Sequence, residues 1–407
     1  MNANPSNLRW FFSPAVLYFV GFIVPFLLVF IGFSKEVSTP HHETLNVILL
    51  GVLGFYLGIA LVYSYFAMFR LAFFPASGAN VGRMLEIDQE KILFMILVTY
   101  WILAIGLLWF EFYKLGALPL LSSAPEELRF LLQVNGYVHL VAISSGYVAF
   151  VFFALFHISS NTVFKIFYAV MIIMTLISLL MTANRIDFLY PIFLMILFYA
   201  FFRGNLFKKE IVYSLFFLLL VFVFVNVVRS SGHDLSYMDN NYAGLGEGFE
   251  PTYLNLSLYP FYMTLTYNFE MLNKLVEEGI SNVTDGLYTF YAFYSLAPGQ
   301  EESFGEFKNR VLGIDFYAEL TSTYLSNFYV DFGKLGVFMG SLIYAILVQS
   351  IWEFSKVSRK NILLYSVVAG PLLFLFYAFY YVYFYAVFQI ILIVFILFFI
   401  RPKFKEA

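Results

Sequence analysis

The feature that most constrains the fold of this chain is a succession of long apolar runs separated by short polar segments. A helix needs about 20 apolar residues to cross the hydrocarbon core of a bilayer. Only 12% of the residues are charged, about half the share in a soluble domain, so the runs cannot all be buried helices of a soluble core. The sequence therefore predicts an all-α polytopic membrane protein with about 10 transmembrane helices. The predicted spans are 11–33, 45–69, 92–113, 136–158, 162–183, 188–202, 211–228, 335–353, 362–380 and 382–400.

Two of these spans need a further argument. The uncharged run Ile362–Ile400 is too long for one crossing at about 1.5 Å of rise per residue. We divide it around Tyr380, with Pro371 as a predicted kink. The span 188–202 is short, so the hairpin before it is expected to lie below the outer surface rather than to project from it.

The distribution of Lys and Arg predicts the orientation of the spans. With the N-terminus in the cytoplasm, Lys and Arg concentrate in the segments that face the cytoplasm, as the positive-inside tendency requires. An even number of spans then places both termini inside the cell. The run Phe11–Phe33 lacks a small-residue cleavage site, and we interpret it as a retained first helix. The chain has no Cys, so cysteine usage gives no information about its compartment.

One large periplasmic or extracellular loop interrupts the spans and holds most of the polar residues. It divides the chain into an N-terminal bundle of about seven spans (1–228), the loop (229–325) and a C-terminal bundle of about three spans (326–407). Within the loop, apolar residues recur at three- and four-residue steps over 252–280, which predicts an amphipathic helix. We expect this helix to lie on or dip into the outer interface; a helix that only packs over the bundle is the alternative.

Arginines on the outer side are the first candidates for chemistry. Arg185 lies in the recessed hairpin before span 188–202, and an ionisable group at membrane depth is a functional hypothesis by default. Asp187 follows at a spacing that does not place the two side chains on one helical face, which leaves Arg185 available for an anion. Arg229 opens the large loop, just before His233 and Asp234, either of which could act as a general base. For any of these arginines the alternative is a side chain that snorkels to the lipid headgroups.

Further candidates for binding a polar substrate lie around the same loop. A guanidinium group matches the oxygens of a phosphate or diphosphate at any relevant pH. Glu319 and Asp331 lie near predicted membrane boundaries. In the stretch Thr321–Ile346, Phe332 and Gly333 are expected to shape a turn from loop to helix, and Gly336 and Gly340 to form a helix-packing seam. The candidate substrate-binding residues are Arg129, Asp187, Lys308, Arg310, Glu319, Tyr324 and Asp331.

Four stretches of this sequence resemble motifs of a known family, the O-antigen polymerase-like repeat-unit polymerases of bacterial surface polysaccharides. LGALPLLSS (Leu115–Ser123) is similar to the family's G-x-x-P-L-L approach to an outer loop. MTANRIDFL (Met181–Leu189) resembles its hairpin arginine, and NVVRSSG (Asn226–Gly232) the arginine that opens its large loop. LTSTYLSNFYVDFGKLGVFMG (Leu320–Gly340) resembles its Y-x-D-F-G-x-x-G ending. The order of the four motifs and the predicted topology agree over most of the chain.

The resemblance implies a membrane-embedded, C-type glycosyltransferase fold that needs no metal, nucleotide or other cofactor. Such an enzyme transfers the growing glycan from undecaprenyl diphosphate to a new lipid-linked repeat unit, in the synthesis of O-antigen (lipopolysaccharide), capsule or exopolysaccharide. It implies that Arg185 and Arg229 touch the diphosphate or the glycan. The chain departs from the family at APGQEESFGEFKNR (Ala297–Arg310), where relatives carry a Pro-Arg pair and a Lys-Pro; Lys308 or Arg310 would substitute.

Two other functions remain open at this point. An O-antigen ligase shares the scaffold and differs in its acceptor. A flippase for the same lipid-linked glycan should hide polar residues along several spans and show internal repeats, whereas here polarity concentrates in one outer loop. The expected partners are the lipid-linked oligosaccharide, the bilayer, and a chain-length regulator and flippase; nothing in the net charge of −3 indicates nucleic acid. No DxD, P-loop, GxSxG or zinc pattern is present.

Overall fold

A computed structural model describes residues 9–73, 85–132, 136–203, 213, 243–250, 252–296, 302–314, 321–358 and 360–402. The first half of the chain forms mostly apolar helices joined by short connections. The first span is built from three consecutive helical pieces, with a π-helical turn between two α-helices. The elements of this half are η1 (Arg9–Phe12), α1 (Pro14–Tyr18), η2 (Phe19–Ile23), α2 (Val24–Val29), α3 (His42–Phe73), β1 (Leu85–Ile87), α5 (Glu90–Leu115), η3 (Pro119–Leu121), α6 (Pro125–Leu131), α7 (Gly136–Ile143), α8 (Ser145–Ile158), α9 (Thr162–Leu180) and α10 (Arg185–Arg203).

The second half contains the helices of the segment that was predicted as a large loop, 229–325, and then the last apolar helices. Its elements are α13 (Tyr253–Glu277), α14 (Tyr291–Tyr294), α15 (Phe304–Leu312), α16 (Tyr324–Val357), α17 (Asn361–Ala369), η4 (Gly370–Phe374), η5 (Tyr380–Val382), α18 (Phe384–Leu397) and β2 (Ile400–Pro402).

The apolar helices occur where the hydropathy pattern predicts spans. Five helical stretches of the described chain are long and apolar enough to cross a membrane: His42–Met68, Glu90–Leu115, Gly136–Ile158, Thr162–Leu180 and Tyr324–Lys356. Shorter apolar helices cover Pro14–Val29, Ile186–Phe202, Asn361–Phe374 and Phe384–Leu397. An all-α membrane protein is thus confirmed. The predicted span 211–228 lies outside the described residues except for Tyr213, so the count of ten stays a prediction.

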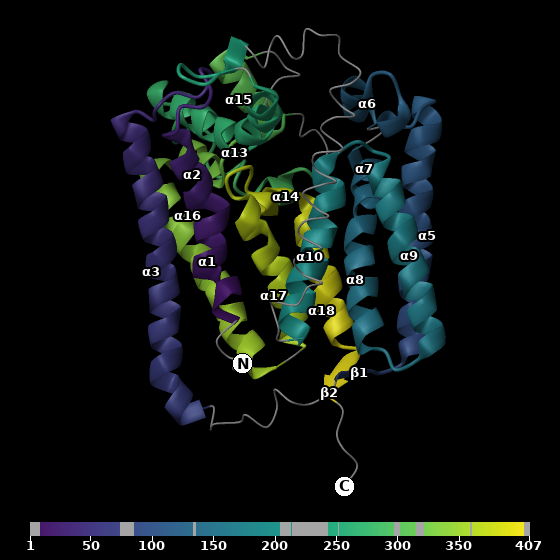
Figure 1. The fold of residues 1–407 in the computed structure, drawn as a ribbon. Coiled ribbons are helices and arrows are strands. Elements are labelled where there is room, and N and C mark those ends of the chain that lie inside the picture. The colour runs from purple at the N-terminus through teal and green to yellow at the C-terminus, as the bar shows by residue number, and fades with distance from the viewer. Residues whose placement is uncertain are drawn as a thin grey trace.

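The helices stand roughly parallel in two groups (Figure 1). In one group α3 runs along α16, with α1 and α2 beside them; in the other, α5, α7, α8 and α9 pack together. The helices α10, α17 and α18 lie between the groups and join them. We call the end of the molecule that carries β1 and β2 the ribbon end, and the end that carries α6, α13 and α15 the loop end (Figure 1).

The ribbon is a feature that the sequence did not predict. Strands β1 and β2 pair antiparallel, with Glu86 opposite Arg401. An ion pair between Arg401 Nη2 and Asp88 Oδ2, 3.0 Å apart, closes the same junction. The end of the last span is thereby attached to the segment that precedes α5.

The run 362–400 divides close to the predicted point. Helix α17 ends at Ala369, and Pro371 lies in the first turn of the 3-10 helix η4 that follows. A second 3-10 turn, η5, covers Tyr380–Val382, and α18 begins at Phe384. The predicted division around Tyr380 and the break at Pro371 are both confirmed. The break has a consequence for the site described below, because it places the η5 tyrosines among other helices rather than along one helical face.

The first part of helix α16 differs from the prediction of a loop-to-helix turn at Gly333. The helix begins at Tyr324, and Gly333 is not a turn that precedes it but a break inside it, with φ +62° and ψ −155°. This combination is essentially restricted to glycine. The predicted packing seam at Gly336 and Gly340 is also wrong, since the space beside these glycines is filled by Phe328 and Phe332 of the same helix.

Helix α13 forms where the pattern predicted a helix, and two of its polar residues, Asn273 and Glu270, are buried. Asn273 Oδ1 accepts hydrogen bonds from the Thr44 hydroxyl at 2.7 Å and the His41 backbone N–H at 2.9 Å. Glu270 Oε2 accepts from the Ser38 hydroxyl at 2.6 Å and its N–H at 2.9 Å. These side chains are buried because they satisfy the connection between α2 and α3, which holds α13 against the first group of helices.

Candidate functional site

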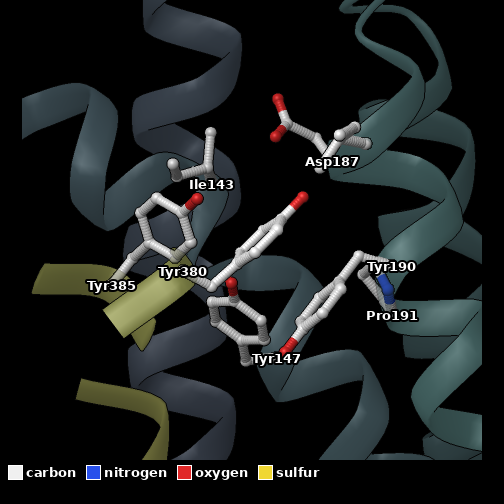
Figure 2. Close-up of a pocket in the computed structure, with 8 residues that line it drawn as sticks. Ile143, Tyr147, Asp187, Tyr190, Pro191, Tyr380 and Tyr385 are labelled. Atoms are coloured by element: carbon white, nitrogen blue, oxygen red, sulfur yellow. The ribbon is translucent and has the colours of Figure 1, made fainter. Parts of the chain in front are cut away.

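A pocket lies between helices of the second group and the pair α18 and η5. It is formed by residues of α7, α8, α10, η5 and α18, and its cavity volume, measured for water-sized molecules, is about 20 Å³. Figure 2 shows that one carboxylate and several tyrosine rings face this space. The lining residues are Ile143, Tyr147, Ile186, Asp187, Tyr190, Pro191, Tyr380 and Tyr385.

The first turns of α10 supply half of this lining because of their helical spacing. Asp187, Tyr190 and Pro191 are three and four residues apart, so they share one face of the helix. Gly146 of α8 allows this face to approach, since a Cβ atom there would stand 2.6 Å from Cγ of Pro191. The hairpin between α9 and α10 therefore sets the position of Asp187 against α8, at the end of α10 nearer the loop end (Figure 1).

Tyrosine rings form the other walls and leave polar atoms unpaired. The rings of Tyr190 and Tyr380 are stacked, with centroids 5.4 Å apart, and those of Tyr147 and Tyr385 are stacked at 6.0 Å. The hydroxyls of Tyr190 and Tyr380 are buried and have no hydrogen-bond partner among the described residues. A buried hydroxyl without a partner is costly. Such a wall is suited to a ligand that offers both hydroxyl groups and flat apolar faces.

Charged side chains gather around Asp187. The side-chain amide of Asn184 donates a hydrogen bond to its carboxylate, and the charges of His139, Arg129 and Glu111 act on it. His139 Nδ1 lies 3.0 Å from Oε2 of Glu111, which is fully buried. The helices α5, α6, α7 and α10 thus each place a charged or titratable side chain near the same corner of the pocket.

Two of the predicted site residues are brought together here, and a third is adjacent in the chain. Asp187 lines the pocket, and Arg129 lies within electrostatic range of it. Arg185 is the first residue of α10, two positions before Asp187, and its side chain is outside the description. The candidates Arg229, His233, Asp234 and Glu319 lie outside the described residues.

Two predicted residues of α16 have partners within the protein. The carboxylate of Asp331 accepts hydrogen bonds from the Thr284 hydroxyl and from the backbone N–H groups of Tyr288 and Thr289. It thereby ties the segment before α14 to α16. Tyr324 is fully buried, and its hydroxyl contacts those of Tyr18 at 2.9 Å and Ser341 at 3.1 Å. Both side chains serve packing of the loop and the first group of helices.

The two candidate cations of α15, Lys308 and Arg310, differ in their burial and in their partners. Lys308 is fully buried, and its ammonium donates to the carbonyl oxygen of Thr321 at 3.0 Å. Arg310 is exposed and forms a two-bond ion pair with Glu302, at 2.7 and 2.8 Å. Its guanidinium holds the pKa of the Glu302 carboxyl below the ordinary value. Neither residue lines the pocket.

Sequence reasoning missed the Glu111–His139 pair and the pocket tyrosines. Glu111 lies one turn before the end of α5 and looks like an ordinary helix-end charge, while His139 is an isolated polar residue in an apolar run. Their pairing depends on how α5 packs on α7. A signal was present, however, since each is an ionisable residue inside a predicted span.

The described residues contain no group of three or more His, Asp or Glu arranged to hold a metal ion.

Comparison with known proteins gives one match. Residues 12–374, most of the chain, match the family model described as "Putative O-antigen polymerase". No curated protein and no solved structure shows a significant similarity to the chain.

Proposed function

The chain belongs to the O-antigen polymerase family, and from this premise we propose that it lengthens a lipid-linked glycan. The substrate is an oligosaccharide repeat unit on polyprenyl diphosphate. The enzyme transfers the growing glycan from one polyprenyl diphosphate to the next repeat unit. In this proposal the loop end faces the outside of the cytoplasmic membrane, where the repeat units arrive, and both termini face the cytoplasm.

The observation that carries the proposal is the pocket with its tyrosine walls and the carboxylate of Asp187. Aromatic rings present flat surfaces to sugar rings, and the unpaired hydroxyl of Tyr380, which points towards Asp187 (Figure 2), can exchange hydrogen bonds with a sugar hydroxyl. A carboxylate within hydrogen-bond reach of an acceptor hydroxyl can act as a general base.

The reaction that fits this site is a single displacement at a sugar. The hydroxyl oxygen of the acceptor sugar forms a bond to the anomeric carbon of the donor glycan, and the bond from that carbon to the diphosphate oxygen breaks. The bonding electrons leave with polyprenyl diphosphate, and the acceptor proton passes to Asp187. We assign Arg185 and Arg229 to the diphosphate, where guanidinium groups stabilise the charge of the leaving group.

Complementation tests this function. A strain that lacks its repeat-unit polymerase would receive the wild-type chain or the Arg185→Ala variant, in the matching glycan background. The surface glycan is read as a gel ladder. We expect a ladder from the wild type and single capped repeats from Arg185→Ala, at equal membrane abundance. Arg401→Ala, in the ion pair at the ribbon end, is the matched control and should keep the ladder.

The same experiment separates the alternatives. If single repeats reach the surface without the chain and do not lengthen when it is supplied, the chain is not a polymerase. If no glycan reaches the surface until the chain is supplied, a ligase or a flippase replaces the polymerase as the explanation.

A further inference from the structure

The short helix α14 presents an exposed aromatic face that the proposed reaction does not use. Phe290, Phe293 and Tyr294 are all exposed. The backbone N–H groups of Phe293 and Tyr294 both donate to the carbonyl oxygen of Phe290, at 2.9 and 3.4 Å, so the three residues share one face of a helical turn. The surrounding sequence, from Gly286 to Gly299, contains no charged residue. A cluster of large exposed aromatic side chains marks an interaction surface.

The opposite side of this segment is fixed to the rest of the protein. Tyr288 is buried, and its backbone N–H donates to the carboxylate of Asp331 in α16. The side-chain amide of Asn327, also in α16, donates to the carbonyl oxygen of Tyr288 at 3.3 Å. Helix α14 packs in addition on α18 and η5, the two elements that supply Tyr385 and Tyr380 to the pocket. The protein therefore holds α14 in one orientation, with its aromatic face directed outwards.

A row of exposed apolar residues on α16 shows what surrounds the neighbouring surface. Leu335, Met339, Ile343 and Leu347 are exposed and recur every four residues, so they lie on one side of the helix. They belong to the stretch Tyr324–Lys356, which is long and apolar enough to cross a membrane. An exposed apolar row on a membrane-spanning helix faces lipid chains.

Phe332 connects this row to α14. It is exposed and lies three residues before Leu335. A Cβ atom at Gly286 would stand 2.9 Å from Cζ of Phe332 and 3.3 Å from Cδ2 of Phe290, so both rings lie against Gly286. The apolar surface of α16 thus continues through Phe332 and Phe290 onto α14. Figure 1 shows α14 nearer to the ribbon end than α13 and α15, at the level where the apolar helices end.

We propose that the aromatic face of α14 lies in the lipid leaflet at the loop end, in contact with acyl chains close to the headgroups. Aromatic side chains are enriched at this depth of a bilayer, and short apolar helix faces bind there without crossing it. Because α14 packs on η5 and α18, its contact with lipid holds one wall of the pocket at the boundary of the leaflet. This inference goes beyond the proposed function and does not depend on the reaction.

The test places one spin label at a time on the surfaces to be compared, which is possible because the chain has no Cys. Phe293→Cys labels the face of α14. Leu335→Cys is the lipid-facing reference, and Glu278→Cys, at an exposed position where α13 ends, is the water-facing reference. Each full-length variant is reconstituted in lipid nanodiscs. Power-saturation EPR then compares collisions of the label with oxygen, which concentrates in the bilayer, and with a water-soluble nickel chelate.

We expect the label at position 293 to collide more with oxygen than with the nickel chelate, as at position 335, and the order to reverse at position 278. A label at position 293 that collides mainly with the nickel chelate would place α14 in water and overturn the proposal. A label that neither reagent reaches would show that protein covers this face, which also overturns it.

A second labelled position covers the case in which the label at position 293 disturbs α14. Phe290→Cys lies on the same face and should give the same order of collisions. Thermal unfolding of both labelled variants in detergent checks that they keep the stability of the unlabelled chain. The collision measurement does not require turnover. A wild-type chain that never lengthens a glycan would therefore refute the proposed function, while the EPR result would still decide where α14 lies.

Discussion

At the scale of single residues, two tyrosines of the pocket, Tyr190 and Tyr380, leave buried hydroxyls without a partner among the described residues, as Tyr262 and Tyr344 do elsewhere. Tyr324 and Tyr365 are as deeply buried as Tyr190 and Tyr380, but their hydroxyls contact other protein atoms. A hydroxyl that is satisfied within the protein contributes to packing, whereas an unsatisfied one is available to a ligand. Replacing a tyrosine by phenylalanine should therefore affect ligand binding where the hydroxyl is unpaired, and packing where the hydroxyl is paired.

We predict that Tyr380→Phe lowers kcat/KM for polymerisation about 5-fold, as expected for one lost hydrogen bond of about 1 kcal/mol. Tyr190→Phe should have a smaller effect, because the Tyr190 hydroxyl points away from Asp187, towards Gly370 (Figure 2). Stability should be unchanged, because no protein partner is lost. Tyr168→Phe is the control, since the Tyr168 hydroxyl contacts Glu90 far from the pocket. Steady-state kinetics with purified protein checks this, and equal kinetics for all three variants would show that the pocket hydroxyls do not meet the substrate.

Gly333 is the residue whose backbone depends most on glycine. Its φ and ψ lie in a region that other residues occupy at a cost of about 1–3 kcal/mol, and a Cβ atom would stand 2.9 Å from Nδ2 of Asn282. We predict that Gly333→Ala destabilises the chain by about that amount, as measured by thermal unfolding in detergent. Gly106→Ala in α5, where a Cβ atom meets open space, should be neutral or slightly stabilising. Equal melting temperatures for the two variants would contradict the account of the break in α16.

At the scale of elements, the large loop is attached to the helices by buried polar groups rather than by apolar contacts alone. Asp331 of α16 accepts hydrogen bonds from three donors around the segment 284–289. We predict that Asp331→Asn loosens this segment at a cost of about 2 kcal/mol, because hydrogen bonds to a charged acceptor are lost or weakened. Hydrogen exchange of residues 283–296 would rise, and it would not rise in the exposed control Asp285→Asn.

The Glu302–Arg310 pair gives α15 a small dependence on pH. Because the hydrogen bond from Arg310 lowers the pKa of Glu302 in the folded chain, the pair stabilises the fold above the unfolded pKa of glutamate. That contribution is lost as the pH falls through the lower, folded value. We predict that Glu302→Gln is slightly less stable than the wild type at pH 7 and that the difference disappears once the pH has fallen below the lowered, folded pKa of Glu302. The contribution is small because the pair is exposed. A difference in melting temperature that grows towards low pH would reverse the sign and refute it.

A property of this chain could be predicted from the sequence when it depends only on the residues of one short segment. The hydropathy of a segment depends only on its own residues, so the apolar helices and the break near Tyr380 could be predicted. The hairpin with Arg185 and Asp187 was also identified, because a short span and a charge are both local signals. By contrast, Glu111 and His139 are 28 residues apart, and Tyr380 and Tyr385 reach Asp187 from the other end of the chain. Their meeting depends on helix packing, which spacing alone does not specify. The burial of Asn273 in α13 depends on helix packing in the same way.

At the scale of the whole molecule, the site lies where the two groups of helices meet. The α10, α17 and α18 helices join the groups, and α10, α18 and η5 supply pocket residues. The loop helices α13 and α15 lie at the same end of the molecule as the start of α10 (Figure 1). A lipid-linked substrate could therefore keep its tail in the bilayer while its sugars reach the pocket. The family assignment and this arrangement support the same proposal independently.

The most direct measurement reconstitutes the purified chain in nanodiscs with polyprenyl diphosphate-linked repeat units and resolves the products by length. The account predicts glycans of two and more repeats, with one free polyprenyl diphosphate released for each new linkage between repeats. It also predicts a loss of about 100-fold or more in Asp187→Asn, as for removal of a general base. Repeat units that stay single with the wild-type chain, or a product ladder from Asp187→Asn equal to that of the wild type, would contradict it.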